Sequence, residues 1–146
     1  MALWEAEHTL DTSAEPHEVW LRLSDVSTWP EWDSGVLWAE LRGPFATGTQ
    51  GRLKLKGEGT RSFRLVRVDA EDTFTATVRL PLAEIRHIHA QTACPVGTRV
   101  THRIEIRGPL AWFFGFTRGR RLREGLAPGL RNLARIASGN PGANGA

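Results

Sequence analysis

Three histidines on two neighbouring predicted strands are the side chains of this sequence best suited to chemistry. His87, His89 and His102 carry imidazoles, which exchange protons near neutral pH. The two strands are predicted to pair as a hairpin, which places His89 opposite His102 and His87 on the same face. We favour a role for all three as hydrogen-bonded polar lining of an interior pocket, and general acid–base catalysis is the alternative.

Burial of these histidines should keep them neutral. Desolvation disfavours the charged imidazolium, so their pKa values should fall below the usual value of about 6.5. The unfolded chain would then bind more protons than the folded chain, and acid should destabilise the fold.

Other kinds of catalytic site find less support in the residue patterns. Three close imidazoles could hold zinc, but such a site also needs supporting partners that the sequence does not reveal, so we predict no metal and no cofactor. No serine or cysteine lies in a nucleophile-elbow pattern, which argues against a hydrolase. The single cysteine, Cys94, cannot form an internal disulfide, and we interpret it as incidental.

The elements that must position the histidines follow the order strand, two helices, six strands and one long helix. The first strand alternates apolar and polar residues from Trp4 to Asp11, a helix is expected over residues 14–24, and a short second helix over 25–33. Glycine, proline and aspartate then interrupt runs of β-formers about every ten residues, which predicts an antiparallel meander. Its strands are expected near residues 35–42, 50–56, 60–69, 72–80, 84–93 and 98–107.

Alternation along these strands assigns one apolar face to the interior. In the strand over 60–69, Phe63 and Leu65 point inward, whereas Val66 and Val68 then point outward. A β-bulge is one explanation, and the sequence leaves the register of this strand open. The side chains expected to bind a ligand come from this inner face and from the C-terminal helix, and they are Leu53, Leu55, Phe63, Phe74, Ala76, Val78, His87, His89, His102, Ile104, Gly115, Gly119 and Leu122.

A long amphipathic helix is expected from Gly108 to Ala137. Its second half carries four leucines at steps of three or four residues, namely Leu122, Leu126, Leu130 and Leu133. The same stripe traced backwards reaches Gly115 and Gly119, where large apolar side chains would be expected. We expect these glycines to leave space for a cavity, and close packing of the helix on a strand is the alternative.

Aromatic residues form two further clusters. Four tryptophans, namely Trp20, Trp29, Trp32 and Trp38, are expected in the core, with contact to a ligand as a second role for some of them. Residues 112–116, Trp-Phe-Phe-Gly-Phe, precede four arginines in residues 118–123. We expect these aromatics to close the cavity and the arginines to be solvated. Contact with anionic lipid headgroups, as in a peripheral membrane lipid carrier, is the less favoured alternative.

Length and composition indicate one domain. The 146 residues, 40% of them apolar, suit a domain over residues 1–137, and the tail over 138–146 is expected to be disordered. The sequence has no run of about 18 apolar residues and no signal-peptide pattern, so a soluble, cytoplasmic protein is expected. Residues 1–50 hold nine acidic and two basic residues, and the remainder seven acidic and seventeen basic. No nucleic-acid-binding motif accompanies the basic part, so we predict no nucleic-acid partner.

Two segments and the order of elements resemble a known family. The residues VW at 19–20 followed by DVSTWPEW at 25–32 look like the helix pair of the bacterial polyketide cyclase/dehydrase family, within the START-like (SRPBCC) helix-grip superfamily. The residues GTRVTHRIEI at 97–106, leading into GPL at 108–110, look like its last strand and the start of its gripping helix. The similarity covers roughly residues 3–137.

The resemblance implies an α+β helix-grip fold, in which a seven-stranded curved antiparallel sheet, two short helices and a long C-terminal helix enclose a cavity. Such cavities bind lipids, polyketides or other hydrophobic small molecules, and members with aromatase/cyclase activity use polar cavity residues, tyrosine and arginine among them. The present sequence contains no tyrosine. We therefore expect binding of a small hydrophobic molecule. A cyclase-like enzyme that uses the cavity histidines as acid–base groups is the alternative.

Overall fold

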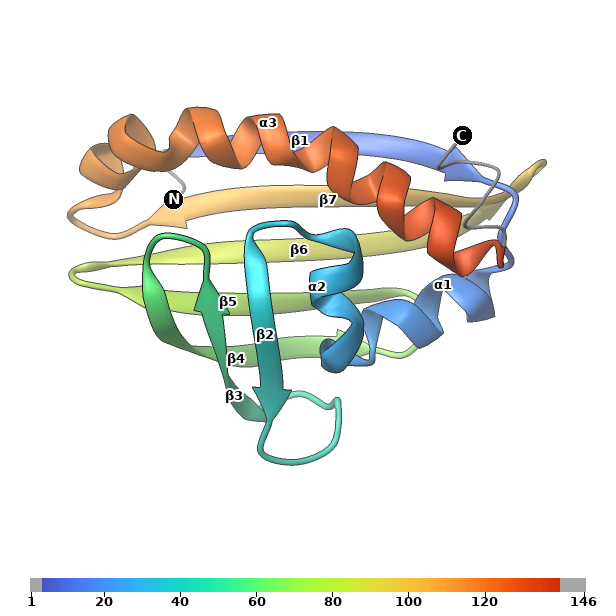
Figure 1. Ribbon diagram of the computed structural model, residues 1–146, viewed down its shortest axis with the longest axis horizontal. Helices are drawn as coiled ribbons and strands as arrows, with labels where there is room; N and C mark the ends of the chain where they lie inside the picture. The colour runs from blue at the N-terminus through green and yellow to red at the C-terminus, as the bar shows by residue number, and fades with distance from the viewer. Residues whose placement is uncertain (1–3, 140–146) are drawn as a thin grey trace.

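A computed structural model describes residues 4–139, which form a curved antiparallel sheet with one long helix lying along it (Figure 1). The order and type of the elements are those predicted from the sequence, and the boundaries move by a few residues. In chain order the elements are β1 (Trp4–Thr12), α1 (Pro16–Leu23), a 3₁₀ turn (Val26–Thr28), α2 (Trp29–Trp32), β2 (Val36–Leu41), β3 (Gln50–Leu55), β4 (Gly59–Asp69), β5 (Thr73–Leu80), β6 (Ala83–Cys94), β7 (Gly97–Arg107) and α3 (Ala111–Ala137).

The seven strands are ordered β1-β7-β6-β5-β4-β3-β2, and every neighbouring pair is antiparallel. The predicted register of the last hairpin is confirmed, because His89 pairs with His102 and His87 pairs with Ile104. Side chains alternate along a strand, so this register brings all three histidines to the inner face of the sheet.

The bulge that the sequence suggested for β4 is present and shapes the sheet. The pairing of β4 with β5 shifts between Leu65 and Arg67, while Phe63 and Leu65 are buried as expected. A bulge bends a strand and increases its twist. In Figure 1, β2 and β3 run steeply across the direction of β5 and β6, so the sheet curls over its own inner face.

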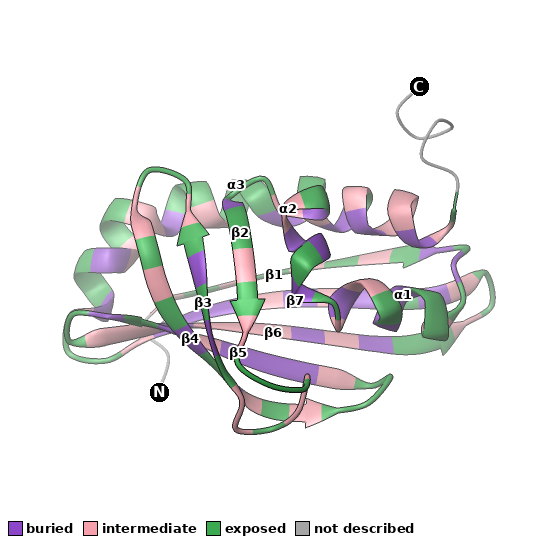
Figure 2. Cartoon of the chain, turned by 60° about the horizontal axis from the view of Figure 1, so that its bottom comes forward, coloured by how far each residue is buried: buried purple, intermediate pink, exposed green. Residues whose placement is uncertain are grey.

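One hydrophobic core joins the inner face of the sheet to α3. Buried and exposed residues alternate along β3 and in the middle of β4, and α3 turns one side toward the sheet (Figure 2). Leu126, Leu130 and Leu133 of α3 are buried in this core, as the leucine stripe predicted. The burial of these leucines anchors the second half of the helix, because each contributes about 1.5–3 kcal/mol.

The first half of α3 packs closely on β1, so the predicted cavity space beneath its glycines is absent. A Cβ atom at Gly115 would lie 3.1 Å from Cδ1 of Trp4, and one at Gly119 would lie 2.8 Å from Cε2 of the same indole. The guanidinium of Arg123 covers the Trp4 ring at 5.3 Å from its centroid. Gly115 and Gly119 therefore make room for Trp4, and the alternative of close helix-to-strand packing is correct.

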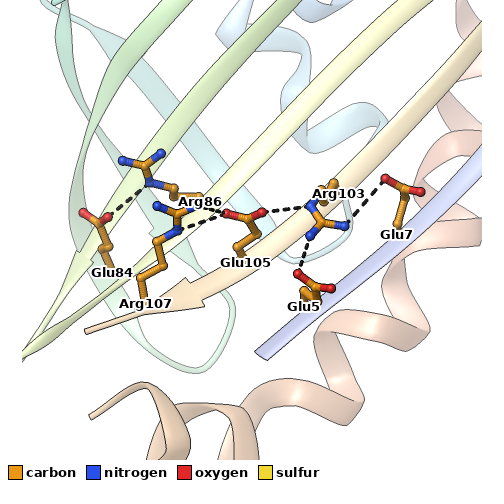
Figure 3. A network of polar contacts seen from close by, with 7 residues as sticks. All are labelled: Glu5, Glu7, Glu84, Arg86, Arg103, Glu105 and Arg107. Atoms are coloured by element: carbon orange, nitrogen blue, oxygen red, sulfur yellow. Dashed lines mark hydrogen bonds and ion pairs between the residues drawn. The ribbon is translucent and has the colours of Figure 1, made fainter. Parts of the chain in front are cut away.

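The outer face of the sheet carries a network of charges on β1, β6 and β7 (Figure 3). The carboxylate of Glu105 accepts hydrogen bonds from Nε of Arg103 at 2.8 Å and from Nε of Arg107 at 3.1 Å. Arg103 also pairs with Glu5 and Glu7 of β1. Burial acts to raise the pKa of Glu105, but the bonds from the two arginines outweigh it and hold that pKa below its usual value.

Two residues of the predicted tail, Ser138 and Gly139, follow α3 directly. Ser138 N donates to Ala134 O at 3.0 Å, and Gly139 N donates to Ile136 O at 3.2 Å, so both are hydrogen-bonded to the last turn of the helix. The rest of the predicted tail, residues 140–146, lies outside the described residues, as do residues 1–3 of the predicted domain. Within residues 4–139, no helix is both long and apolar enough to cross a membrane.

Candidate functional site

A cavity of about 550 Å³ lies between the inner face of the sheet, α2 and the middle of α3. The curl of β2 and β3 over the sheet supplies one wall, and β5 and β6 supply the floor. Eight of the residues predicted from the sequence line it, namely Leu53, Leu55, Phe74, Ala76, Val78, His87, His89 and Leu122.

Five residues predicted to line the cavity lie elsewhere. Phe63 packs against Trp29 at a ring distance of 5.5 Å, and Ile104 is buried in the core. His102 lies behind His87 and His89. Gly115 and Gly119 of α3 face Trp4. The cavity therefore occupies only part of the inner face of the sheet, because α2 and α3 pack directly against other parts of that face.

The remaining lining residues were not in the predicted site. Trp29 and Trp32 were expected mainly in the core, and they are buried and also form part of the cavity wall. Ile85 shares the inner face of β6 with the histidines, so strand alternation could have found it. The others come from two loops, the first residue of β2 and α3, and they are Asp33, Ser34, Gly35, Val36, Lys56, Gly57, Glu58 and Arg121.

A column of four stacked rings runs along the inner face. Trp29 and Phe74 are 6.0 Å apart and nearly parallel, and Phe74 stacks on His89 at 4.9 Å. His89 in turn stacks on His102 at 3.9 Å. The edge of Trp32 meets His89 at 5.5 Å and 79°. The histidines are thus held by aromatic packing, which fixes their ring planes.

His87 and His102 form a hydrogen-bonded pair beside the cavity. Nδ1 of His87 lies 3.1 Å from Nε2 of His102, so one of these nitrogens carries the proton and the other accepts it. Because Nδ1 is engaged, Nε2 is the nitrogen that His87 can offer to a ligand. If the direction of this hydrogen bond is reversed, both neutral rings must change tautomer, and Nε2 of His87 then changes from a hydrogen-bond acceptor to a donor.

Burial lowers the pKa of all three histidines. Desolvation, with a smaller contribution from His87, lowers the pKa of His89 to about 3. Desolvation, followed by the charges on His89 and His87, places the pKa of His102 well below its usual value. Desolvation also lowers the pKa of His87, although the carboxylate of Asp33 acts in the opposite direction. All three rings are therefore neutral near pH 7.

The arrangement of the histidines does not favour zinc coordination. His89 and His102 face each other in nearly parallel planes, whereas ligands of one metal ion point their nitrogens at a common centre. Among residues 4–139, no group of three or more His, Cys, Asp or Glu side chains is arranged to hold a metal ion. Neither nitrogen of His89 has a hydrogen-bond partner within the described chain.

The mouth of the cavity lies between the α2–β2 loop, the β3–β4 turn and α3. The exposed lining residues at this opening are Ser34, Gly35, Lys56, Gly57 and Arg121. Glu58 of the turn accepts hydrogen bonds from Arg118 at 2.6 and 2.9 Å and from Arg121 at 3.1 Å. Burial acts to raise the pKa of Glu58, but these arginines lower it overall. This ion-pair cluster ties the turn to the helix at the edge of the mouth.

The aromatic segment at the start of α3 does not close the cavity, contrary to the favoured prediction. Phe114 is buried, with the guanidinium of Arg118 at 4.7 Å from its ring centroid. Trp112, Phe113 and Phe116 are exposed to solvent. None of these four aromatic residues is among those that line the cavity.

Comparisons with solved structures return the same fold at low sequence identity. Protein NE0264 from Nitrosomonas europaea has a TM-score of 0.73 at 13% identity, and the match covers 92% of this chain and 94% of that one. A Thermobifida fusca protein has a TM-score of 0.69 at 20% identity, and the match covers 91% of this chain and 92% of that one. The di-domain ARO/CYC StfQ of the steffimycin biosynthetic pathway reaches 0.73 at 15% identity, covering 92% of this chain and 50% of StfQ. No curated protein matches the sequence.

A family model supplies the assignment that structural likeness alone does not. The family described as polyketide cyclase / dehydrase and lipid transport matches residues 4–138, which is nearly all of the chain that the structure describes. The sequence motifs, the helix-grip fold and this match agree. The chain therefore belongs to the polyketide cyclase/dehydrase and lipid transport family.

Proposed function

We propose that this protein binds a small, largely apolar molecule in the cavity, with a polar end of that molecule at the mouth. The observation that carries the proposal is the distribution of side chains along the cavity. Its interior is mostly aromatic and aliphatic, with His87 and His89 on the wall, whereas Lys56, Glu58 and Arg121 lie at the opening. The volume of about 550 Å³ falls within the range of about 300–1,000 Å³ that is typical of small-molecule pockets.

A cavity-filling variant tests this proposal directly. Ala76 lines the cavity, so Ala76→Leu adds side-chain volume inside it, whereas Ala90→Leu adds the same volume on the outer face of β6. We expect the wild type and Ala90→Leu to bind the fluorescent probe 1-anilinonaphthalene-8-sulfonate, and Ala76→Leu to bind it at least about tenfold more weakly. Equal probe binding by all three proteins would contradict a site in this cavity.

The natural ligand can be sought in the same preparation. Native mass spectrometry of the purified wild type should show a co-purifying small molecule, and Ala76→Leu should carry less of it. The exact mass would then give the chemical class of the ligand.

A second candidate function is catalysis of ring closure in a ligand that carries several ketone groups. The observation that favours it is the hydrogen-bonded pair of His87 and His102 at the cavity wall. In such a reaction Nε2 of neutral His87 would remove a proton from a carbon between two carbonyl groups. The resulting enolate carbon would attack a second ketone carbon of the same molecule, and the new alkoxide would take the proton back from His87. The reaction needs no further reactant, because the cavity only has to fold the chain and move one proton.

Kinetic measurements distinguish catalysis from ligand binding without catalysis. Turnover of a poly-β-ketone model substrate should fall about 10²–10⁴-fold in His87→Gln, the usual contribution of a general base, while probe binding is retained. Equal turnover by the wild type and His87→Gln would remove the catalytic candidate and leave the binding function in place.

A further inference from the structure

Three aromatic side chains at the start of α3 project into solvent. Trp112 is 64% exposed, Phe113 is 42% exposed and Phe116 is 87% exposed. Aromatic side chains usually bury about 150–250 Å² each, so their exposure on two successive helical turns is unusual. The inward positions of these turns are already occupied by Ala111 and Phe114, which are buried. The exposed rings therefore do not contribute to the core of the described domain.

A leucine on a neighbouring turn extends this surface. Leu82, between β5 and β6, is 68% exposed, and its carbonyl accepts a hydrogen bond from Leu110 N at 3.0 Å. That bond holds the turn beside the first residue of α3. We refer to Leu82, Trp112, Phe113 and Phe116 as the aromatic patch.

Basic residues continue the patch along the helix. At about 100° per residue, the three aromatic residues of α3 fall within an arc of about 100°, and Arg120 and Arg123 fall within the same arc. The Arg120 side chain is 91% exposed, and its partner Glu124 is also largely exposed. The whole of α3 carries six arginines and a single glutamate. The helix thus presents apolar rings and positive charge on one side.

We propose that the aromatic patch docks the protein on the surface of an anionic lipid bilayer. Aromatic rings that project from a helix enter the boundary between headgroups and acyl chains, and neighbouring arginines pair with anionic headgroups. The charge of α3 complements such a surface, and the projecting rings suit a soft apolar layer. This inference concerns a surface outside the cavity and goes beyond the proposed function.

The aromatic patch and the cavity mouth lie on different sides of α3. Phe116 and Arg121 are five residues apart, which is about 8 Å along the helix axis and about 140° around it. Arg121 lines the mouth and pairs with Glu58 of the β3–β4 turn. Docking through the aromatic patch therefore does not depend on the cavity or on its ligand.

Vesicle flotation tests the docking without any ligand in the cavity. The probes are vesicles of phosphatidylcholine alone and vesicles that also contain phosphatidylglycerol. We expect the wild type to float with the anionic vesicles at low salt, and Trp112→Ser/Phe116→Ser to bind them at least about tenfold more weakly, as expected for the loss of two apolar contacts. Arg120→Gln, which leaves the contact of Arg123 with Trp4 intact, should weaken binding to anionic vesicles and reduce its dependence on salt.

A matched control removes exposed apolar side chains elsewhere. Leu37 is 50% exposed on β2 and Val96 is 61% exposed in the β6–β7 turn, so Leu37→Ser/Val96→Ser should float like the wild type.

Absence of flotation of the wild type at low salt would overturn the proposal, and so would equal losses in the control and the patch variant. A wild-type dimer in analytical ultracentrifugation that Phe116→Ser dissociates, without vesicle binding, would assign the patch to a second copy of the chain instead. Probe binding in the cavity is measured separately, so failure of docking and failure of the proposed function are distinguishable.

Discussion

The imidazoles of His89 and His102 stack face to face, with ring centroids 3.9 Å apart and planes 25° from parallel. The register of β6 and β7 places the two residues opposite each other, and Phe74 covers the other face of His89 at 4.9 Å. Two imidazoles this close and this deeply buried cannot both take up protons without a large cost. The stack is therefore stable only while its rings are neutral.

Acid should destabilise the protein through this stack. The pKa of His89 is about 3 in the folded chain and about 6.5 when unfolded, so the unfolded chain binds more protons between these values. The stability from the neutral ring is complete above about pH 6.5 and is lost as the pH falls toward about 3. We expect His89 alone to lower the free energy of unfolding by about 2 kcal/mol between pH 8 and pH 5. Urea unfolding across this range measures the slope.

Glutamine variants identify the titrating groups. His89→Gln and His102→Gln remove the ionisable rings, so each should reduce the loss of stability in acid, and the double variant should reduce it most. Parallel losses in the wild type and the double variant would assign the acid sensitivity to other groups.

Two glycines of α3 should respond to alanine in opposite directions. At Gly119 a new Cβ would crowd the Trp4 indole, so Gly119→Ala should lower the free energy of unfolding by about 1–3 kcal/mol. At Gly125 a new Cβ would meet no atom of the described chain within 4 Å. Gly125→Ala should therefore raise the free energy of unfolding by about 0.5–1 kcal/mol, because alanine has the higher helix propensity. Thermal and urea unfolding measure both effects. An unchanged free energy of unfolding in Gly119→Ala would show that Trp4 is not tightly packed against this glycine.

The outer charge network should depend on Glu105 more than on its exposed members. The Glu105 side chain is 9% exposed and accepts hydrogen bonds from two arginines, so Glu105→Gln should cost about 1–3 kcal/mol of stability. Glu40→Gln removes an exposed carboxylate paired with Arg52 and should cost less than about 1 kcal/mol. Since the folded pKa of Glu105 is depressed, its contribution is present above about pH 4.5 and is lost as the pH falls further. Equal costs for the two variants would contradict this ranking.

Glu58 should control exchange at the cavity mouth. Its carboxylate ties the β3–β4 turn to Arg118 and Arg121, so Glu58→Gln should loosen the turn and speed both entry and release of the fluorescent probe. The affinity for the probe should change little, because the apolar interior is unaltered. Stopped-flow fluorescence gives both rates, and Glu124→Gln on the exposed side of α3 is the control. Unchanged rates in Glu58→Gln would show that another part of the wall opens.

Much of the fold was predictable because its signals are local. Side chains alternate every second residue in a strand, so once the last hairpin was centred, the contact of His89 with His102 followed. The bulge in β4 was suggested for the same reason, since Phe63 and Val68 could not share one face without an extra residue between them. Such inferences need only the chain on either side of one turn.

The limits of the cavity depended on elements that meet from distant parts of the chain. The helix pattern showed that Gly115 and Gly119 lacked side chains on the inward face, but Trp4, more than 100 residues earlier, decided that an indole fills that space. Likewise, helix spacing showed that four aromatics near Phe114 could not all face inward, but it could not show which of them the sheet would cover. Sequence alone determined which residues share a face. Only the tertiary structure decided what each face meets, because the curvature of the sheet and the path of α3 across it arise from packing between elements that local periodicity does not encode.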